Sequence, residues 1–134
     1  VVTGRIANRF NLQGTNCTTD AACASSFSAL SMAINELYLG DSDLVITGEG
    51  KLDKQTRFGK TPFGVAQMAR RYGKPVIAVA GTLDEDAGLL YDHGFDLLMP
   101  IQEKPDTLEN SLKEAAKLLE RTGERMARLL KMEI

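Results

Sequence analysis

Short, continuously apolar runs bounded by turn residues constrain the fold of this chain most. They lie at residues 44–47, 76–80 and 97–99. Runs of this kind are typical of strands that are buried on both faces, as in a parallel sheet covered by helices. Between them, apolar residues recur at helical spacing, so strands and helices alternate along the chain. The alternation predicts right-handed crossovers and a mostly parallel sheet of about four strands.

Four helices are expected from apolar residues at three- and four-residue spacing. Their expected ranges are 27–40, 61–73, 84–94 and 106–129. Gly40 and Gly73 supply C-terminal stops, and Thr61 supplies an N-cap. Nearer the start of the chain, a helix is expected over 3–10 and a fourth strand over 15–19. The predicted fold is one three-layer α/β/α domain over residues 1–134, Rossmann-like or flavodoxin-like.

The charge balance excludes two classes of partner. The 134 residues include 16 Lys and Arg against 18 Asp and Glu, which gives a net charge of −2. This balance provides no field that would attract nucleic acid or an anionic membrane. No apolar run approaches the roughly 20 residues of a membrane-spanning helix, and no signal peptide opens the chain. We therefore expect a cytoplasmic protein that binds neither nucleic acid nor membranes.

The segment 48–61 carries the residues best suited to bind phosphate. It follows a strand and ends at a helix N-terminus, which attracts anions. Gly48 and Gly50 let backbone amides approach an anion, and lysines add positive charge. Carboxylates in the segment can hold Mg²⁺ or accept a hydroxyl proton. The candidate catalytic residues are Glu49 and Asp53, and the candidate phosphate-binding residues include Gly48, Gly50, Lys51 and Lys60.

Two phosphate-binding motifs match this segment only in part. Residues 59–61 fit the end of a Walker loop, but Lys54 replaces its first glycine. The dinucleotide pattern begins at Gly48 and Gly50 and then meets Asp53 in place of its third glycine. The alternative is a long, solvated connection whose glycines serve only turns.

The string DLVITGEGKLD at residues 43–53, followed by Gln55 and Thr56, resembles the signature of the bacterial glycerate kinase family. Residues 72–77, 80–83 and 93–96 match that family as well, and the resemblance covers residues 43–134. It implies transfer of the ATP γ-phosphate to glycerate, with ATP and Mg²⁺ as cofactors. It also implies an active-site cleft that contains Glu49 and Asp53, with Gln55 and Lys60 nearby. Gln55 and Thr56 are further candidates for binding phosphate or substrate. Only the C-terminal part of a longer two-domain enzyme is matched, so one wall of the cleft is expected here.

Residues 4–10, Gly14 and 19–26 resemble a different family, the β-ketoacyl synthases of polyketide and polyunsaturated fatty-acid synthesis. That resemblance runs to about Gly48 and implies that Cys23 is an acyl-accepting nucleophile. A thiol at a helix start has its thiolate favoured, but the two histidines that the family needs do not follow. Free cysteines are more often buried and inert. No metal site is expected from two cysteines and one histidine.

Three hypotheses stay open on the sequence. The first is a chimeric or engineered α/β domain, ketosynthase-like over 1–43 and kinase-like over 44–134, with no complete active site and no native catalysis. The second is a glycerate kinase-type phosphotransferase fragment that binds ATP or phosphate through residues 48–60. The third is an acyl-accepting thiol protein that uses Cys23. The expected partner is a small phosphate ligand, and the apolar stripe of the last helix also favours a homodimer.

Overall fold

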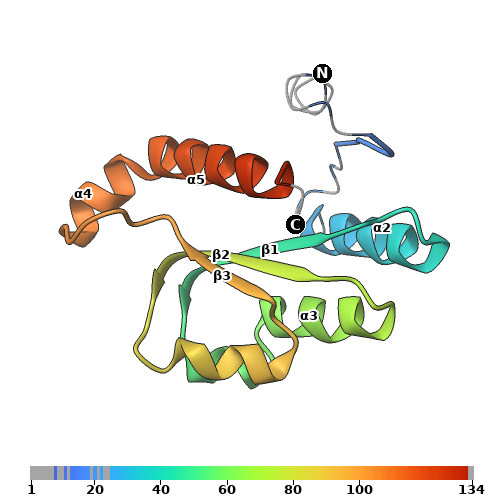
Figure 1. Cartoon of the computed structure of the whole chain (residues 1–134), viewed down its shortest axis with the longest axis horizontal. Coiled ribbons are helices and arrows are strands. Elements are labelled where there is room, and N and C mark those ends of the chain that lie inside the picture. Colours follow the sequence, from blue (N-terminus) through green and yellow to red (C-terminus); the bar gives the residue numbers. More distant parts are fainter. Residues whose placement is uncertain are drawn as a thin grey trace. The chain divides into compact units, whose positions relative to one another are not determined.

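The computed structural model describes residues 25–132 together with residues 8, 11, 13–18, 20 and 22. The chain divides into two compact units, Val1–Asp43 and Leu44–Ile134. The first unit contains α2 (Ser25–Leu39) (Figure 1). The elements of the second unit are β1 (Val45–Leu52), η2 (Lys54–Arg57), α3 (Thr61–Arg71), β2 (Val76–Leu83), η3 (Ala87–His93), β3 (Leu97–Pro100), α4 (Leu108–Lys113) and α5 (Ala115–Leu130), where η marks a 3₁₀ helix.

In the first unit the stop after α2 is confirmed. Gly40 has a φ of +81°, and its amide donates to the carbonyl of Leu37 at 3.2 Å. Residues 15–18 of the strand expected over 15–19 are irregular and exposed, so they form no strand. Thr19, and the helix expected over 3–10 apart from Asn8, lie outside the described residues.

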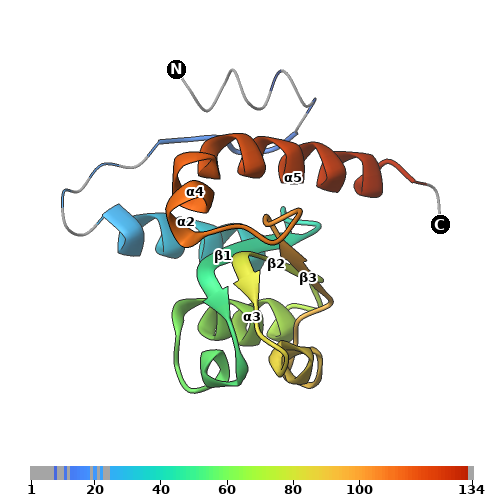
Figure 2. The same ribbon diagram turned by 90° about the vertical axis from the view of Figure 1, so that its left-hand side faces the viewer.

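The second unit contains the predicted parallel sheet. Its strand order is β1-β2-β3, and both pairs are parallel. The described residues form three strands rather than the expected four, since the segment at 15–18 contributes none. Figure 2 shows α3 on one side of this sheet and α5 on the other, as Figure 1 also does, so the α/β layering is confirmed within the unit.

The core of the second unit lies among the sheet, α3 and η3. Leu52, Val76 and Leu90 are completely buried. The small side chains of Ala66 and Ala69, also completely buried, let α3 pack closely against the sheet. The remaining members of this cluster are Ala78, Ala80, Ala87, Phe95 and Leu98. Burial of Leu52 at the last position of β1 anchors the carboxyl edge of the sheet, where the predicted site begins.

β1 and β2 are longer than the apolar runs that predict them, because glycines extend both strands. A Cβ at Gly81 would collide with the carbonyl oxygen of Gly50, and one at Gly48 would lie 3.0 Å from the Val79 oxygen. These glycines therefore permit close strand contact. The expectation that residues 48–60 form one long loop is wrong for 48–52, which are strand.

The helix boundaries differ from expectation in three places. Lys60, not Thr61, is the N-cap residue of α3. The segment expected as a helix over 84–94 is the shorter η3, which ends at Gly94 with a φ of +93°. The single helix expected from 106 is two helices that meet at Glu114. Among the described residues, no helix is both long and apolar enough to cross a bilayer.

Candidate functional site

One ammonium group lies between two carboxylates at the carboxyl edge of β1. Glu49 comes from β1, Asp53 is the N-cap residue of η2, and Lys60 is the N-cap residue of α3. Lys60 Nζ lies 3.4 Å from Asp53 Oδ1 and 3.8 Å from Glu49 Oε1. The side chains of Glu49, Asp53 and Lys60 are 27%, 19% and 36% exposed. This Glu49–Asp53–Lys60 cluster carries one net negative charge and remains open to a ligand.

Asp53 is held in place by a capping box. Its Oδ1 accepts hydrogen bonds from the amides of Gln55 at 2.9 Å and Thr56 at 3.1 Å. The Asp53 amide in turn donates to Thr56 Oγ1 at 3.3 Å, and Thr56 is completely buried. Burial disfavours ionisation of Asp53, but Lys60 and the two amides outweigh it and hold its pKa below the ordinary value. Of the predicted residues, Gln55 thus serves this cap through its backbone amide, and Thr56 serves it through both its amide and its side-chain hydroxyl.

Glu49 has a different environment from Asp53. Its Oε1 faces Lys60, whereas its Oε2 is buried and has no hydrogen-bond partner among the described residues. A buried carboxylate oxygen without a donor is costly, so it favours a ligand that brings a hydroxyl or a cation.

Two further lysines of the segment pair with acids that follow β2. Lys51 Nζ lies 2.8 Å from Asp84 Oδ2, and Lys54 Nζ lies 3.4 Å from Asp86 Oδ2. The hydrogen bond between Lys51 and Asp84 raises the pKa of the lysine and lowers that of the acid. Asp84 and Asp86 are not among the predicted site residues. The signal that could have found them is their position directly after β2, which neighbours β1.

The remaining candidate residues are not brought into the cluster. Gly48 and Gly50 lie in β1, so they form no flexible phosphate loop. Cys23 lies outside the described residues, and Cys17 is exposed with its thiol 3.8 Å from the sulfur of Met32. His93 ends η3, and its ring centroid lies 6.2 Å from that of Phe63. Within the described part of the chain, no group of three acidic, His or Cys side chains is suited to hold a metal ion.

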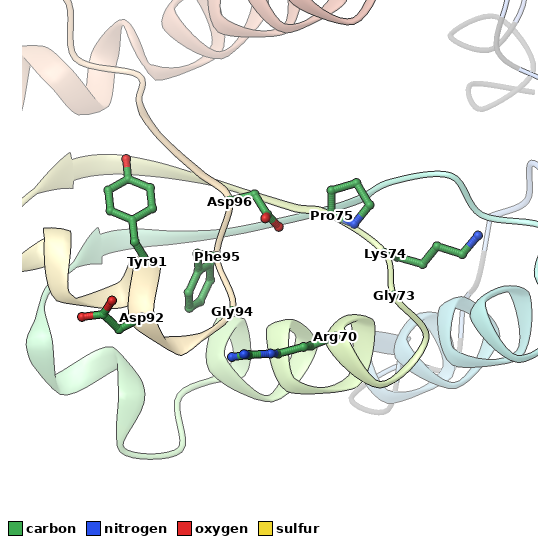
Figure 3. A pocket seen from close by; sticks show the side chains of 9 residues that line it. All are labelled: Arg70, Gly73, Lys74, Pro75, Tyr91, Asp92, Gly94, Phe95 and Asp96. Carbon is green, nitrogen blue, oxygen red and sulfur yellow. The ribbon is translucent and has the colours of Figure 1, made fainter.

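A cavity of about 630 Å³ lies at the opposite, amino edge of the sheet (Figure 3). Its lining residues are Arg70, Gly73, Lys74, Pro75, Tyr91, Asp92, Gly94, Phe95 and Asp96. Asp96 Oδ2 accepts a hydrogen bond from the Val76 amide at 2.7 Å, so this carboxylate ties the start of β2. In Figure 3 the Lys74 side chain points away from those of Tyr91 and Asp92, and the polar groups do not converge. The cluster at the carboxyl edge is therefore the stronger candidate site.

Comparison with known proteins identifies relatives of one kind over most of the chain. The family model described as the glycerate kinase family matches residues 14–131. The glycerate kinase of Haemophilus influenzae is 46% identical over 93 residues, which is 69% of this chain and 25% of that protein. The crystal structure of a protein described as glycerate kinase 2 from Salmonella typhimurium LT2 has 41% identity and a TM-score of 0.50. It covers 78% of this chain and 26% of that one. This chain thus spans about a quarter of the length of these curated glycerate kinases.

A second kind of relative is also found. One component of the polyunsaturated fatty acid synthase of Thraustochytrium is 44% identical over 77 residues, which is 54% of this chain and 3% of that protein. The glycerate kinase match begins at residue 14 and continues past residue 43, so it includes much of the segment expected to be ketosynthase-like. The comparisons therefore support the kinase resemblance over a longer range than expected. They give no support to a chimeric or engineered origin.

Proposed function

Since the chain belongs to the glycerate kinase family, we propose that it forms the part of a glycerate kinase-type phosphotransferase that binds the phosphates of ATP. The observation that carries the proposal is the position of Lys60, at the N-terminus of α3 and beside two carboxylates. No side chain caps that helix, so its positive end adds to the ammonium charge in attracting phosphate.

The two carboxylates of the cluster suit different roles. Asp53 Oδ1 is occupied by two backbone amides and by Lys60, and its position holds the ammonium at the cluster. Glu49 Oε2 has no donor among the described residues. Glu49 is therefore the better acceptor for the hydroxyl proton that glycerate loses when its oxygen attacks phosphorus.

ATP is used with Mg²⁺, and the residues fit that ion. Mg²⁺ is usually held by one or two carboxylates together with phosphate oxygens and water, and Glu49 and Asp53 supply carboxylate oxygens next to Lys60. The ion would neutralise charge on the phosphates. Its binding would also relieve the net negative charge of the cluster.

We expect that this chain alone binds ATP without transferring its phosphate to glycerate. Phosphoryl transfer needs charge stabilisation from several sides and exclusion of water. The cluster side chains remain 19–36% exposed, which leaves water access to the reacting atoms. In a coupled assay we expect glycerate to cause no ATP consumption above background. Measurable turnover would show that this chain alone suffices for catalysis, and it would leave the binding proposal intact.

Calorimetric titration with Mg²⁺-ATP tests the binding proposal. The wild-type chain should give saturable heat, and Lys60→Ala should weaken binding by about tenfold or more, because a charged contact to phosphate is lost. The control is Lys113→Ala, which removes an exposed lysine paired with Glu109 on α4 and should bind like the wild type. Flat heats at millimolar nucleotide, or equal affinity of the Lys60→Ala variant, would refute the proposal.

A further inference from the structure

The two 3₁₀ helices at the carboxyl edge are joined by a single carboxylate. Asp86 Oδ1 accepts a hydrogen bond from the backbone amide of Lys54 at 2.9 Å, across 32 positions of sequence. Its other oxygen, Oδ2, lies 3.4 Å from the ammonium group of the same lysine. Asp86 thus binds both the backbone and the side chain of the first residue of η2.

The hydrogen bonding of Asp86 differs from that of an ordinary N-cap aspartate. Asp86 is the N-cap residue of η3, where an aspartate usually accepts from its own helix. Here its side chain makes no cap hydrogen bond to η3. The carboxylate is instead directed to η2, and it is only 31% exposed there.

The amides at the start of η2 are shared between two carboxylates. The first amides of a helix have no acceptor within the helix. Asp86 satisfies the amide of Lys54, and Asp53 satisfies those of Gln55 and Thr56. Because Lys54 directly follows Asp53, fixing its amide restricts where the Asp53 carboxylate lies, and through it Lys60.

We propose that Asp86 is a positioning residue that fixes the start of η2 and thereby holds Asp53 and Lys60 in place for a phosphate ligand. The positioning of η2 stands on geometry alone. The consequence for a phosphate ligand rests on the function proposed above.

Asp84 offers a matched control. It forms a shorter ion pair than Asp86, 2.8 Å to Lys51, but both partners are about half exposed, at 54% for Lys51 and 46% for Asp84. Nothing in the described structure shows its carboxylate accepting from the backbone of η2. If negative charge alone restrains η2, substitution of either acid should speed amide exchange there. If the backbone hydrogen bond restrains η2, only substitution of Asp86 should do so.

Amide hydrogen exchange on the full chain, without nucleotide, tests the positioning of η2. In Asp86→Ala the amides of Lys54, Gln55 and Thr56 should exchange at least about tenfold faster than in the wild type, because a charge-assisted hydrogen bond is lost. Asp86→Asn keeps an acceptor oxygen and should recover most of the protection. Asp84→Asn should change these rates less than about twofold.

Three outcomes would overturn the inference. They are unchanged exchange in Asp86→Ala, an Asp86→Asn variant as unprotected as Asp86→Ala, and an equal effect of Asp84→Asn. The amide of Ala78 in the buried β2 reports global unfolding. If Asp86→Ala also loses protection at Ala78, that variant is globally destabilised. The exchange rates of the η2 amides in Asp86→Asn and in the wild type then decide whether Asp86 positions η2.

Nucleotide titration separates this inference from the proposed function. If the wild type binds Mg²⁺-ATP, Asp86→Ala should weaken the Kd by about fivefold or more, and Asp86→Asn should restore most of it. Unchanged affinity in a variant with a loosened η2 would overturn the link to the ligand. If the wild type does not bind, the proposed function fails while the exchange experiment still decides the positioning of η2.

Discussion

At the scale of single residues, Glu49 and Asp53 show how two carboxylates four positions apart acquire different chemistry. Asp53 accepts from two amides and Lys60, whereas Glu49 keeps one buried oxygen without a partner among the described residues. The sequence identifies both as candidates because acids near lysines suit a phosphate site. It cannot separate them, since the difference arises from the capping box that forms only when η2 folds.

The lowered pKa of Asp53 predicts a pH dependence of stability. Lys60 and the capped amides hold that pKa below its ordinary value of about 4. The ionised carboxylate therefore stabilises the fold at pH values above about 4, and this contribution is lost as the pH falls through the lower folded pKa. The free energy of unfolding should be lower for Asp53→Asn than for the wild type at pH 7, with a gap that narrows below about pH 4. Urea unfolding measured across this range checks it, and a gap that stays constant down to pH 2 would contradict the assignment.

Gly81 supplies a second test at this scale. A Cβ there would collide with the Gly50 carbonyl oxygen, which belongs to the paired strand and cannot move freely. Gly81→Ala should therefore lower the free energy of unfolding by about 2–3 kcal/mol. The control is Gly64→Ala within α3, where an added Cβ meets nothing within 4 Å, and a gain of about 0.5–1 kcal/mol is expected. Equal effects of the two substitutions in chemical denaturation would contradict the close contact between strands.

At the scale of elements, the sequence predicts the strands better than their ends. Apolar runs locate β1, β2 and β3, because burial on both faces requires continuous apolar residues. This rule ends β1 at Gly48 and β2 at Gly81, which is too early. Both strands continue beyond these glycines, because the absence of a side chain there permits close contact between the strands. Residues 15–18 show the converse error. Their composition favours an extended strand, but no described strand pairs with them and they remain irregular.

η3 packs on the core through Leu90 and the smaller Ala87, and Leu90 is the larger of the two buried side chains. Leu90 is completely buried in the core, whereas its neighbour Leu89 is 45% exposed. Leu90→Ala should cost about 3 kcal/mol of unfolding free energy, and Leu89→Ala should cost less than about 1 kcal/mol. Similar costs for both variants, measured by chemical denaturation, would show that η3 does not pack on the sheet as described. The packing of η3 also fixes the position of Asp86, which is its N-cap residue.

At the scale of the whole molecule, the fold class follows from the sequence, and the site follows in part. Alternating strand and helix signals predict a parallel α/β sheet, and such sheets place ligands at their carboxyl edge. Lys60, Glu49 and Asp53 lie together at that edge, and their role in binding a ligand stays a prediction. Asp84 and Asp86 directly follow β2 and so belong to the same edge, but their pairing with Lys51 and Lys54 could not be predicted. It depends on β2 lying next to β1, which spacing along the chain does not reveal.

We propose that the carboxyl edge of this sheet binds the phosphates of ATP. The most direct test is to titrate Mg²⁺-ATP into the ¹⁵N-labelled chain and to map the shifted amide resonances. If the phosphates bind at this edge, saturable shifts should be concentrated at residues 49–61 and 84–86. Shifts confined to residues 70–75 and 91–96, which line the cavity at the opposite edge, or no shifts at millimolar nucleotide, would contradict it.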